Sequence, residues 1–399
     1  MEDFESLREY LPEGIEVESI EPETLRERID AGEEVTILDV RMESEYDEWH
    51  IERKNVESVN VPYFEFIDGV DEDVLERVPD GEPVVAVCAK GGASQFVAGT
   101  VIDEGFDAVN MAGGMNEWAR IYDVVDVTRA PGPGTVLQFQ RPSTGCVGYL
   151  VYHEGEAAIV DPLRAFTDFY VDLADDLDVT IEYAMDTHVH ADHLSGVREL
   201  GAETSAETVL SREAIARGVT YDVDHEVEDG DEFALGDTTI EALATPGHTT
   251  GMTTYHVDEA VLLTGDGLFT ESVARPDLEE GDKGAPDAAR QLYDTLQELL
   301  EYPDDTLVAP GHFSDAADPA ADGSYTARLG DLEARMEALG YGREAFVEFV
   351  LEDMPPRPGN FEEIIATNLG QESVDDDKAF ELELGPNNCA ATRESMTSD

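Results

Sequence analysis

The sequence predicts two consecutive α/β domains, and three observations support this prediction. The chain has 399 residues, which is long for one hydrophobic core and suits two domains of ordinary size. Residues 1–125 alternate short apolar runs with helical patterns, as expected for a parallel sheet with helices. From residue 135 onward, closely spaced β-runs are followed by alternating strands and helices, which favours sheets sandwiched between helices.

The predicted elements of the first domain follow the order of the chain. The apolar runs VTILDVR at 35–41 and PVVAVCA at 83–89 are expected to be buried strands. A helix is predicted over residues 94–104, and the short strand DAVNM is predicted over 107–111. The segment GGMNEWAR at 113–120 begins with a glycine turn and continues as a helix.

The second domain begins with a predicted β-meander. Its three runs are VLQFQ, GYLVYH and AAIVDP, and they lie close together in the sequence. The strands and helices that alternate after them are TIEYAMDT, TVLSREAIARG, TTIEALATPGH, MTTYHV and AVLLTGD. The pattern therefore changes from that of the first domain to that of a larger layered domain.

The domain boundaries are predicted from composition. The segment TRAPGPG at 128–134 alternates prolines with glycines, which interrupts regular structure strongly. We therefore predict a first domain over 1–127, a linker over 128–134 and a second domain over 135–345. Residues 346–399 are predicted to form a C-terminal extension that packs on the second domain.

The charge of the chain excludes several classes of partner. It carries 92 Asp and Glu against 24 Lys and Arg, a formal net charge of −68. Nucleic acid and anionic membranes require a basic face, so both are excluded as partners. Disorder is also excluded, because 41% hydrophobic residues can fill cores. Carboxylates spread along the whole chain, combined with scarce lysine, are typical of proteins from salt-in halophiles, where molar salt screens self-repulsion.

The sequence also predicts the cellular compartment. The N-terminal residues are acidic and lack the apolar stretch of a signal peptide. The longest uninterrupted apolar run, at 84–89, is far shorter than a membrane span. Cys88, Cys146 and Cys389 are too few and too widely separated for a disulfide framework. A reduced, cytoplasmic protein is expected.

The first candidate site is a cysteine in a loop that precedes a helix. Cys88 ends a buried strand, two glycines follow, and Ser94 is placed to cap the next helix. Backbone N–H groups that converge in such a loop, together with a helix N-terminus, bind anions and stabilise a thiolate. The alternative is a buried structural cysteine at the end of a strand.

Motifs around Cys88 favour the functional interpretation. DVR at 39–41, HI at 50–51, NVP at 60–62 and GGMNEW at 113–118 occur in the order seen in rhodanese domains, and residues 20–125 resemble that family. The resemblance implies that Cys88 accepts a sulfane sulfur as a persulfide and transfers it to an acceptor. Where the family often has arginine this loop has Ala93, so Lys90 is expected to supply the local cation.

The second candidate site is a group of histidines and aspartates with the spacing of metal ligands. THVHADH contains four potential ligands, and single histidines or aspartates follow in ATPGH, LLTGD and APGH. Each motif follows an apolar run, so the side chains are expected to meet at one edge of a sheet. The residues are His188, His190, Asp192, His193, His248, Asp266 and His312.

This set resembles the metallo-β-lactamase superfamily over residues 135–340, which implies an αββα sandwich. Two subfamilies within it carry the same ligands. Resemblance to thioester hydrolases of the glyoxalase II type implies two Zn(II) ions. One would be held by His188, His190 and His248, and the other by Asp192, His193 and His312, with Asp266 bridging. The metals would activate a hydroxide for attack on a thioester.

Resemblance to persulfide dioxygenases implies one Fe(II) per chain instead. The ligands would be His188, His248 and Asp266, a two-histidine, one-carboxylate set with open positions for oxygen and a persulfide sulfur. The products would be sulfite and the free thiol. The remaining four residues of the set would orient ligands and substrate. Relatives commonly self-associate, so a homo-oligomer is expected by resemblance.

The flanking sequence favours the dioxygenase. Arg275 and Asp277 form an Arg-x-Asp pair after the LLTGD motif, as in persulfide dioxygenases, and Arg275 is expected to bind the anionic substrate. The segment at 356–370 resembles dioxygenases fused to rhodanese domains. The fusion is also chemically consistent. Sulfite could accept sulfur from the Cys88 persulfide, or Cys88 could deliver persulfide to the iron.

The two other cysteines have less informative surroundings. Cys146 enters an apolar strand and is expected to lie in the core. Cys389 lies in LGPNNCAA, where its thiol is either exposed and able to carry persulfide or part of a loop that simply docks.

Overall fold

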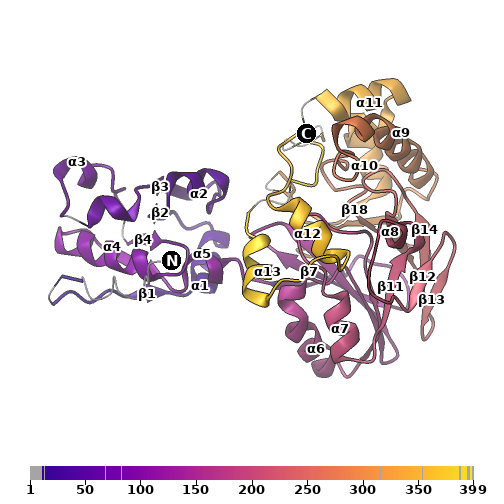
Figure 1. Cartoon of the computed structure of the whole chain (residues 1–399), viewed down its shortest axis with the longest axis horizontal. Helices are drawn as coiled ribbons and strands as arrows, with labels where there is room; N and C mark the ends of the chain where they lie inside the picture. Colours follow the sequence, from indigo (N-terminus) through magenta and orange to yellow (C-terminus); the bar gives the residue numbers. More distant parts are fainter. Residues whose placement is uncertain are drawn as a thin grey trace. The chain divides into compact units, whose positions relative to one another are not determined.

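The computed structural model contains two compact units, which divide at Tyr122 and Asp123, with residues 141–143 grouped with the first (Figure 1). The described residues are 11–12, 14–67, 69–81, 83–314, 316–352, 354–385, 388–392 and 396–397. The predicted α/β class is confirmed for both units.

The first unit is a five-stranded parallel sheet in the order β1-β5-β4-β2-β3. Apolar side chains pack on both faces of this sheet, since β4 is buried at every position. The strands are β1 (Ser19–Ile20), β2 (Val35–Asp39), β3 (Val56–Asn60), β4 (Val84–Val87) and β5 (Ala108–Met111). The helices are α1 (Pro22–Asp30), α2 (Glu43–Glu48), α3 (Glu72–Leu75), α4 (Gly92–Asp103) and α5 (Gly114–Trp118).

Helix α4 begins two residues earlier than the sequence predicted. Its N-cap is Gly91, whose φ of 81° lies in the left-handed region that glycine adopts readily. The helix has no side-chain cap, so the predicted capping role of Ser94 is wrong. Ser94 instead lies within the first turn, where its hydroxyl points to other partners.

The second unit contains two sheets that pack face to face. One has the order β12-β11-β10-β9-β8-β7-β6, and the other has the order β13-β14-β15-β16-β17-β18. The strands of the first are β6 (Asp123–Asp126), β7 (Thr135–Arg141), β8 (Cys146–His153), β9 (Glu156–Val160), β10 (Thr180–Met185), β11 (Glu207–Ser211) and β12 (His225–Val227). Those of the second are β13 (Glu232–Leu235), β14 (Thr238–Ala244), β15 (Thr253–Val257), β16 (Val261–Gly265), β17 (Leu307–Pro310) and β18 (Ala327–Arg328).

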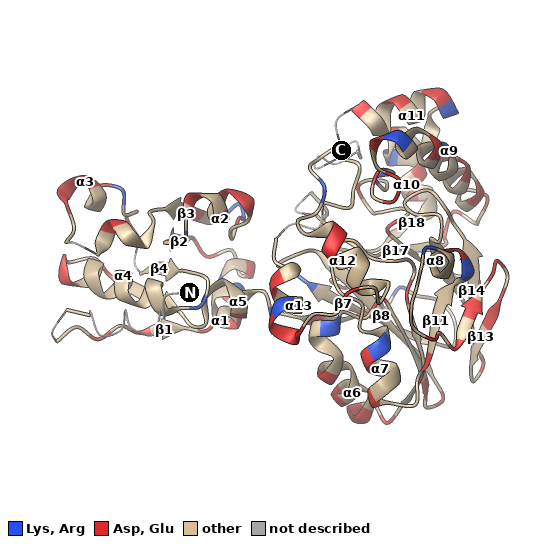
Figure 2. Ribbon diagram, in the orientation of Figure 1, with Lys and Arg blue, Asp and Glu red and all other residues tan. Residues whose placement is uncertain are grey.

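The second unit also contains helices, some of which pack on the sheets and others on helices and loops. They are α6 (Thr167–Asp176), α7 (Val197–Glu203), α8 (Arg212–Ala216), α9 (Gly281–Leu299), α10 (Leu329–Arg335), α11 (Arg343–Glu352), α12 (Phe361–Asn368) and α13 (Asp376–Leu382). Figure 2 shows Asp and Glu distributed over many of these helices and strand ends, with few Lys or Arg among them. None of the described helices has the length and apolarity that a membrane crossing requires.

The segment that was predicted to link the two domains lies within the second unit instead. Residues 128–134 connect β6 to β7, which are adjacent antiparallel strands of one sheet. The division between the units therefore precedes β6, and the proline- and glycine-rich segment is a strand connection within the second unit. Composition alone could not show this, because the pairing of β6 depends on a partner strand.

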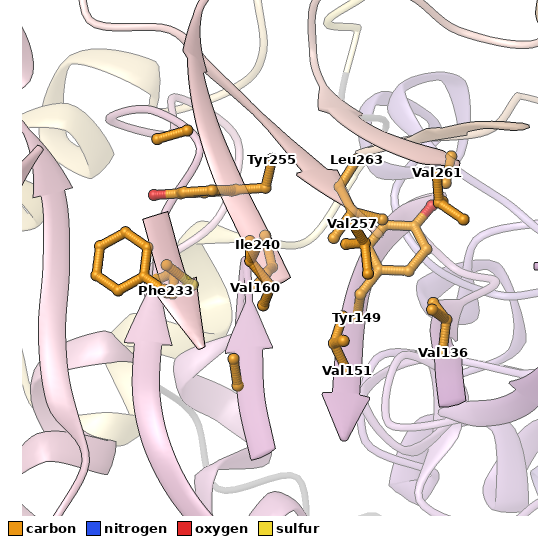
Figure 3. Close-up of a cluster of buried hydrophobic side chains, with 14 of the residues drawn as sticks. Val136, Tyr149, Val151, Val160, Phe233, Ile240, Tyr255, Val257, Val261 and Leu263 are labelled. Atoms are coloured by element: carbon orange, nitrogen blue, oxygen red, sulfur yellow. The ribbon is translucent and has the colours of Figure 1, made fainter. Parts of the chain in front are cut away.

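Two buried tyrosines link the sheets of the second unit (Figure 3). Tyr149 on β8 donates a 2.7 Å hydrogen bond to the carbonyl of Pro310, at the end of β17 in the other sheet. Tyr255 on β15 donates a 3.1 Å hydrogen bond to the carbonyl of Asp186, just after β10. Both links hold the strand ends that precede the predicted histidine motifs.

Replacing Tyr149 should test the first of these links. Gln138 donates to the Tyr149 hydroxyl at 3.0 Å, so Tyr149→Phe leaves that amide and the Pro310 carbonyl without this partner. We expect the free energy of unfolding to fall by about 1–3 kcal/mol in chemical denaturation at high salt. The control is Tyr152→Phe, a half-buried position on the same strand, which should change stability by less than about 0.5 kcal/mol. Equal effects of the two variants would contradict the proposed link.

Candidate metal centre and cysteine loop

All seven predicted metal ligands lie at one edge of the two-sheet sandwich. The loop after β10 carries His188, His190, Asp192 and His193, and the three others follow β14, β16 and β17. Each is at most 6% exposed. Strands β16 and β17 are parallel, so the residues that follow them lie at the same edge. The sequence prediction that these motifs meet is confirmed by this arrangement.

Three of these side chains form a compact group. The Nε2 atoms of His188 and His248 each lie 3.7 Å from Oδ2 of Asp266. None of the three atoms has a hydrogen-bond partner within the described part of the chain, although all are buried. Leaving a buried polar atom unpaired costs about 1–3 kcal/mol. A metal ion bound by two imidazoles and one carboxylate would satisfy all three, so the residues fit a mononuclear centre.

The protonation states of this group also suit a metal. Burial lowers the pKa of His188 well below its usual value and lowers the pKa of His248. Burial raises the pKa of Asp266, but the neighbouring histidines outweigh this, and the net pKa is lowered. Two neutral imidazoles therefore face one carboxylate, which is the form in which these groups bind metals.

The second ring nitrogen of each of these histidines is held in place. Nδ1 of His248 donates to the carbonyl of Arg275 at 2.9 Å. Nδ1 of His188 bonds to the hydroxyl of Thr187 at 2.9 Å, and that hydroxyl donates to Asp161. These contacts leave the Nε2 lone pairs directed at the centre, as in proteins whose outer contacts orient metal ligands.

His312 connects the centre to a second carboxylate. Its Nδ1 donates to Oδ1 of Asp266 at 2.5 Å, and its Nε2 donates to Oδ2 of Asp192 at 2.7 Å. Burial opposes the charged form, but the two carboxylates outweigh it and raise the pKa of His312 well above its usual value. In this arrangement His312 is doubly protonated, and Asp266 keeps one oxygen for a metal.

His190 is turned toward a carboxylate that the sequence analysis missed. Its Nε2 donates to Asp161 at 3.1 Å and lies 3.6 Å from Asp186. Burial and the nearby His193 lower the pKa of His190, but these carboxylates outweigh both and raise it to about 9. Asp161 directly follows the buried strand β9, as Asp266 follows β16, and that shared position was the available signal.

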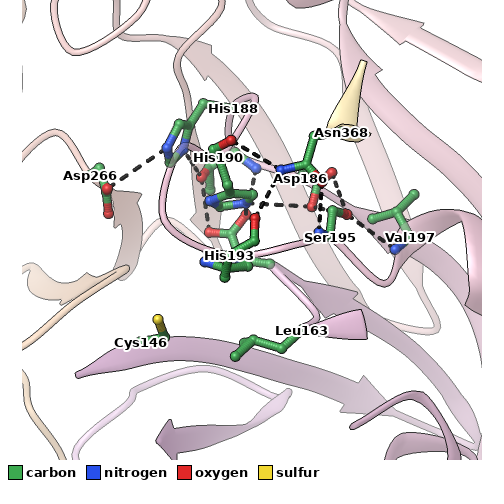
Figure 4. Close-up of polar contacts among 12 residues, drawn as sticks. Cys146, Leu163, Asp186, His188, His190, His193, Ser195, Val197, Asp266 and Asn368 are labelled. Atoms are coloured by element: carbon green, nitrogen blue, oxygen red, sulfur yellow. Dashed lines mark hydrogen bonds and ion pairs between the residues drawn. The ribbon is translucent and has the colours of Figure 1, made fainter. Parts of the chain in front are cut away.

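Cys146 is buried in β8, as predicted, and it also lies at this centre. Its sulfur donates to Oδ2 of Asp192 at 3.3 Å, and it forms a buried group with Asp192, His193 and His312. Figure 4 shows the sulfur directed toward the histidine loop. Oδ1 of Asp192 and Nε2 of His193 have no hydrogen-bond partner among the described residues, so this group could hold a second cation.

Cys389 also lies at the centre. It is 0% exposed, and its sulfur groups with Asp192, Asp266 and His312. Of the two interpretations left open by the sequence, the docked loop is confirmed and the exposed thiol is wrong. Burial, then the carboxylates of Asp192 and Asp266, raise the pKa of Cys389 well above its usual value.

The C-terminal extension holds the histidine loop in place. The side-chain amide of Asn368, at the end of α12, donates to the carbonyls of His190 and His193 at 3.0 and 2.9 Å. Its oxygen accepts from the backbone N–H of Ser195 at 3.0 Å (Figure 4). The asparagine thus satisfies three backbone groups of a loop that has no regular structure of its own.

Arg275 has a different role from the substrate binding that was predicted. It is 1% exposed, and its guanidinium forms a fork with Asp277 at 2.7 and 3.1 Å. Its Nη1 donates to the carbonyls of Pro356 and Asn388, both at 2.9 Å. Arg275 therefore clamps the C-terminal extension to the loop after β16, and these contacts occupy the guanidinium that was expected to face substrate.

The Cys88 loop has the geometry of an anion site. The sulfur lies at the end of β4, is 6% exposed, and accepts from the backbone N–H of Gly91 at 3.1 Å. The Ser94 hydroxyl lies 3.2 Å from the sulfur and 2.7 Å from Oδ1 of Asn110. Lys90 is exposed in the same loop. The structure thus brings Cys88 and Ser94 together, and the contact that sequence reasoning missed is Asn110.

The GGM motif at 113–115 lies against this loop, and the residues after its glycines bond to the loop backbone. The backbone N–H of Met115 donates to the carbonyl of Cys88 at 2.8 Å, and that of Asn116 donates to Ala89 at 3.0 Å. A Cβ at Gly114 would lie 2.2 Å from the Cys88 carbonyl oxygen, and its φ is 65°. Only glycine permits this approach, so the motif and the cysteine loop require each other.

Comparisons with known protein families agree with this geometry. Residues 143–312 match the model of the metallo-beta-lactamase superfamily, and residues 21–121 match the rhodanese-like domain. In solved structures, a metallo-beta-lactamase from Staphylococcus aureus has a TM-score of 0.54 at 26% identity, covering 61% of this chain and 75% of that one. ETHE1 from Myxococcus xanthus has a TM-score of 0.50 at 29% identity, covering 59% of this chain and 98% of that one.

The relatives include persulfide dioxygenases and hydroxyacylglutathione hydrolases. The persulfide dioxygenase ETHE1 of Homo sapiens is 32% identical over 39% of this chain and 59% of its own length, so the chain spans less than two thirds of it. The Bos taurus protein of the same name is 30% identical over 46% and 70%. A hydroxyacylglutathione hydrolase of Methylobacillus flagellatus is 31% identical over 55% of this chain and 80% of its own length.

Replacing Asp161 tests its role behind the histidine loop. Asp161→Asn removes the charge that raises the pKa of His190 and weakens the contacts that hold Thr187 behind His188. We expect metal affinity to fall about 10- to 100-fold, measured by competition with a chelator. The control is Asp178→Asn, an exposed residue with the same left-handed backbone, which should bind metal normally.

The same variant should change the pH dependence of stability in metal-free protein. A raised pKa in the folded state stabilises fully below the unfolded value of about 6.5, and that contribution is lost as pH rises through about 9. Wild-type stability should therefore fall between these pH values, and Asp161→Asn should flatten the fall. An identical slope in both proteins, measured by denaturation, would contradict this assignment.

Proposed function

Because the chain belongs to the metallo-beta-lactamase superfamily and also carries a rhodanese-like domain, we propose that it is a persulfide dioxygenase with a sulfurtransferase domain. A low-molecular-weight thiol persulfide, oxygen and water would give sulfite and the free thiol. The written balance is RSSH + O2 + H2O → RSH + H2SO3. One Fe(II) per chain is the proposed metal, and its ligands are His188, His248 and Asp266.

The observation that carries this proposal is the use of the two Asp266 oxygens. Oδ2 faces the unpaired Nε2 atoms of His188 and His248, whereas Oδ1 accepts from His312. With Oδ1 committed to His312, Asp266 presents one free oxygen to the two imidazoles, and these three atoms make a ligand set for one metal. The two-histidine, one-carboxylate set with open positions is the ligand set of non-haem Fe(II) oxygenases.

Residues of the chain would orient the metal ligands and exclude water from the metal. Fe(II) held by this set would supply oxygen activation and a site for a sulfur donor. Arg275 and Thr187 hold the two histidines in the tautomer that directs Nε2 inward. His312 orients Asp266 through a hydrogen bond, and its imidazolium lies between the carboxylates of Asp266 and Asp192. Complete burial of the ligands excludes bulk water from this edge of the sandwich.

The cysteine loop would handle the sulfane sulfur. The Gly91 amide and the Ser94 hydroxyl, together with the N-terminus of α4, would stabilise a sulfur anion on Cys88. Lys90 would add positive charge at the exposed side of the loop. The persulfide on Cys88 would then pass its sulfur to sulfite, or would supply the iron centre.

A binuclear hydrolase is the alternative, and one observation favours it. Nδ1 of His190, Nε2 of His193 and Oδ1 of Asp192 are also buried without a hydrogen-bond partner among the described residues. They could serve a second metal beside the first if His312 gave up its proton. The relatives that are hydroxyacylglutathione hydrolases are consistent with this alternative.

Metal content and oxygen uptake separate the two functions. We expect protein purified and loaded anaerobically to retain one iron per chain and to consume oxygen when given glutathione persulfide. Asp266→Asn and His248→Ala should each abolish both properties, because they remove ligands from the three-residue set. Retention of two zinc ions, with hydrolysis of a glutathione thioester and no oxygen uptake, would refute the proposal.

The cysteine loop can be tested independently of the metal. Cys88→Ser should abolish transfer of sulfur from thiosulfate to cyanide, because a hydroxyl is a poor nucleophile near neutral pH. Ser94→Ala removes one hydrogen bond to the sulfur and should slow the transfer about tenfold. Both variants should keep the iron content of the wild type. Undiminished transfer by Cys88→Ser would remove this cysteine from the mechanism.

A further inference from the structure

Asn110 is a buried polar side chain on a largely apolar face of the sheet in the first unit. It lies on β5 opposite Ala86 of β4, which is two residues before Cys88, and it is 4% exposed. Ala108, on the same face of β5, belongs to the apolar cluster that packs against α4. Burying an amide in such a cluster costs free energy unless it is hydrogen-bonded, and asparagine is depleted in strands. Packing alone therefore does not explain an asparagine at this position.

The partner of Asn110 is the hydroxyl of Ser94, which also contacts the Cys88 sulfur. This hydroxyl donates to Oδ1 of Asn110 at 2.7 Å and lies 3.2 Å from the sulfur. The other hydrogen bond to the sulfur from a described residue comes from the backbone N–H of Gly91, which can only donate. A serine hydroxyl has one proton and donates it to one partner at a time. With that proton on Asn110, the hydroxyl offers the sulfur a lone pair, which suits a protonated thiol.

A sulfur anion at Cys88 requires the opposite arrangement. A thiolate or a persulfide anion only accepts hydrogen bonds, so Ser94 must then donate its proton to the sulfur. A half-turn of the Asn110 amide exchanges its oxygen for its NH2 group, which would donate to the Ser94 oxygen. Among the described residues no other hydrogen bond holds this NH2 group, so the half-turn breaks no further contact.

The charged groups near this loop are paired or exposed. Arg41 and Asp39, at the end of β2, form a buried ion pair at 2.6 Å. Lys90 in the loop and Glu117 on α5 are both exposed. The contact with the sulfur whose direction can change is therefore the hydroxyl of Ser94, and Asn110 is the residue that bonds to this hydroxyl from the other side.

We propose that Asn110 is a positioning residue for sulfur transfer by Cys88, because its amide can turn and so reverse the hydrogen bond between Ser94 and the sulfur. The inference rests on the proposed sulfurtransferase activity of the first unit. The amide oxygen supports the resting thiol, and the amide NH2 group supports the two anionic forms of the sulfur. A side chain that only accepts, or one without polar atoms, could not serve both.

The transfer step passes through both anionic forms. The Cys88 thiolate attacks the outer sulfur of thiosulfate, and a new S–S bond forms as the S–S bond of thiosulfate breaks. Sulfite leaves with the electron pair, and the persulfide anion remains on Cys88. Cyanide then takes the outer sulfur as thiocyanate, and the thiolate is restored. No net oxidation occurs, and the sulfur is an acceptor at each stage.

Asn110→Asp is the sharpest test, because a carboxylate has the shape of the amide but only accepts hydrogen bonds. It would hold the Ser94 proton and leave the sulfur anion without that donor. Full-length protein at high salt is treated with iodoacetamide across a pH series, and alkylation of the Cys88 peptide is followed by mass spectrometry. We expect the midpoint pH of alkylation to rise by about one unit or more.

The matched control is Asn116→Asp. This half-buried residue on α5 bonds to the same loop through its backbone, at Ala89, so the variant adds the same charge beside the loop without a contact to Ser94. It should raise the midpoint by less than half as much as Asn110→Asp. Equal shifts in the two variants, or no shift in Asn110→Asp, would overturn the inference.

A Ser94→Ala background separates the role of the hydroxyl from that of charge. If Asn110 acts through Ser94, Asn110→Asp should shift the midpoint by less than half as much in this background. A charge that acts directly on the sulfur would give the same shift in both backgrounds, and that result would overturn the inference. Transfer of sulfur from thiosulfate to cyanide should also fall about tenfold in Asn110→Asp near neutral pH and recover as the pH rises.

A second variant covers the case in which a buried carboxylate prevents folding. Asn110→Ala removes the NH2 donor behind Ser94, so it should slow sulfur transfer about three- to tenfold when Ser94 is present and not at all in Ser94→Ala. Equal slowing in both backgrounds would overturn the inference. Failure of the proposed function is distinguishable, because alkylation requires no sulfur transfer. Wild-type protein that is alkylated at Cys88 but transfers no sulfur would refute the sulfurtransferase activity, whereas the midpoint shifts test Asn110.

Discussion

The hydrogen bond between His312 and Asp266 is the contact on which the rest of the metal centre depends. It commits one carboxylate oxygen and leaves the other facing the two unpaired imidazole nitrogens. The partner of His312 on its other side is Asp192, so a buried cation lies between two buried anions. Burying charged groups costs free energy unless they are paired. Because His312 pairs with Oδ1 of Asp266, only Oδ2 of that carboxylate faces the two imidazoles.

The fold supports that contact from several distant segments. Tyr149 and Tyr255 join the two sheets at the strand ends that precede His312 and His188, so the halves of the centre meet at a set distance. Asp161 and Asn368 both hydrogen-bond to the loop between β10 and α7. This loop contributes four of the seven candidate metal-binding residues, yet it contains no helix or strand. Side chains from other segments therefore supply hydrogen bonds to its backbone.

The proposed sulfur chemistry and the surface charge would place opposing demands on this chain. Persulfide and sulfite are anions, and a formal net charge of −68 repels them. Molar salt would shorten the Debye length to about 3 Å and leave only local fields. The local positive ends are the Gly91 amide at Cys88 and the proposed metal at the sandwich edge. Cys146 and Cys389 are buried at that edge, away from the acidic surface.

The sequence alone was sufficient to predict the two α/β units, the Cys88 loop and the seven candidate metal-binding residues. These predictions rest on short-range spacing, because four potential ligands in one heptapeptide and a glycine pair after a strand are local patterns. Tertiary structure decided how the ligands divide, since the partners of His312 and His190 come from other strands. Tertiary packing also places Cys146 and Cys389 at the centre, and it makes Arg275 a clamp for the C-terminal extension. Hydrogen bonds between residues more than a hundred positions apart exist only after the sheets and the C-terminal extension pack, and no local pattern encodes them.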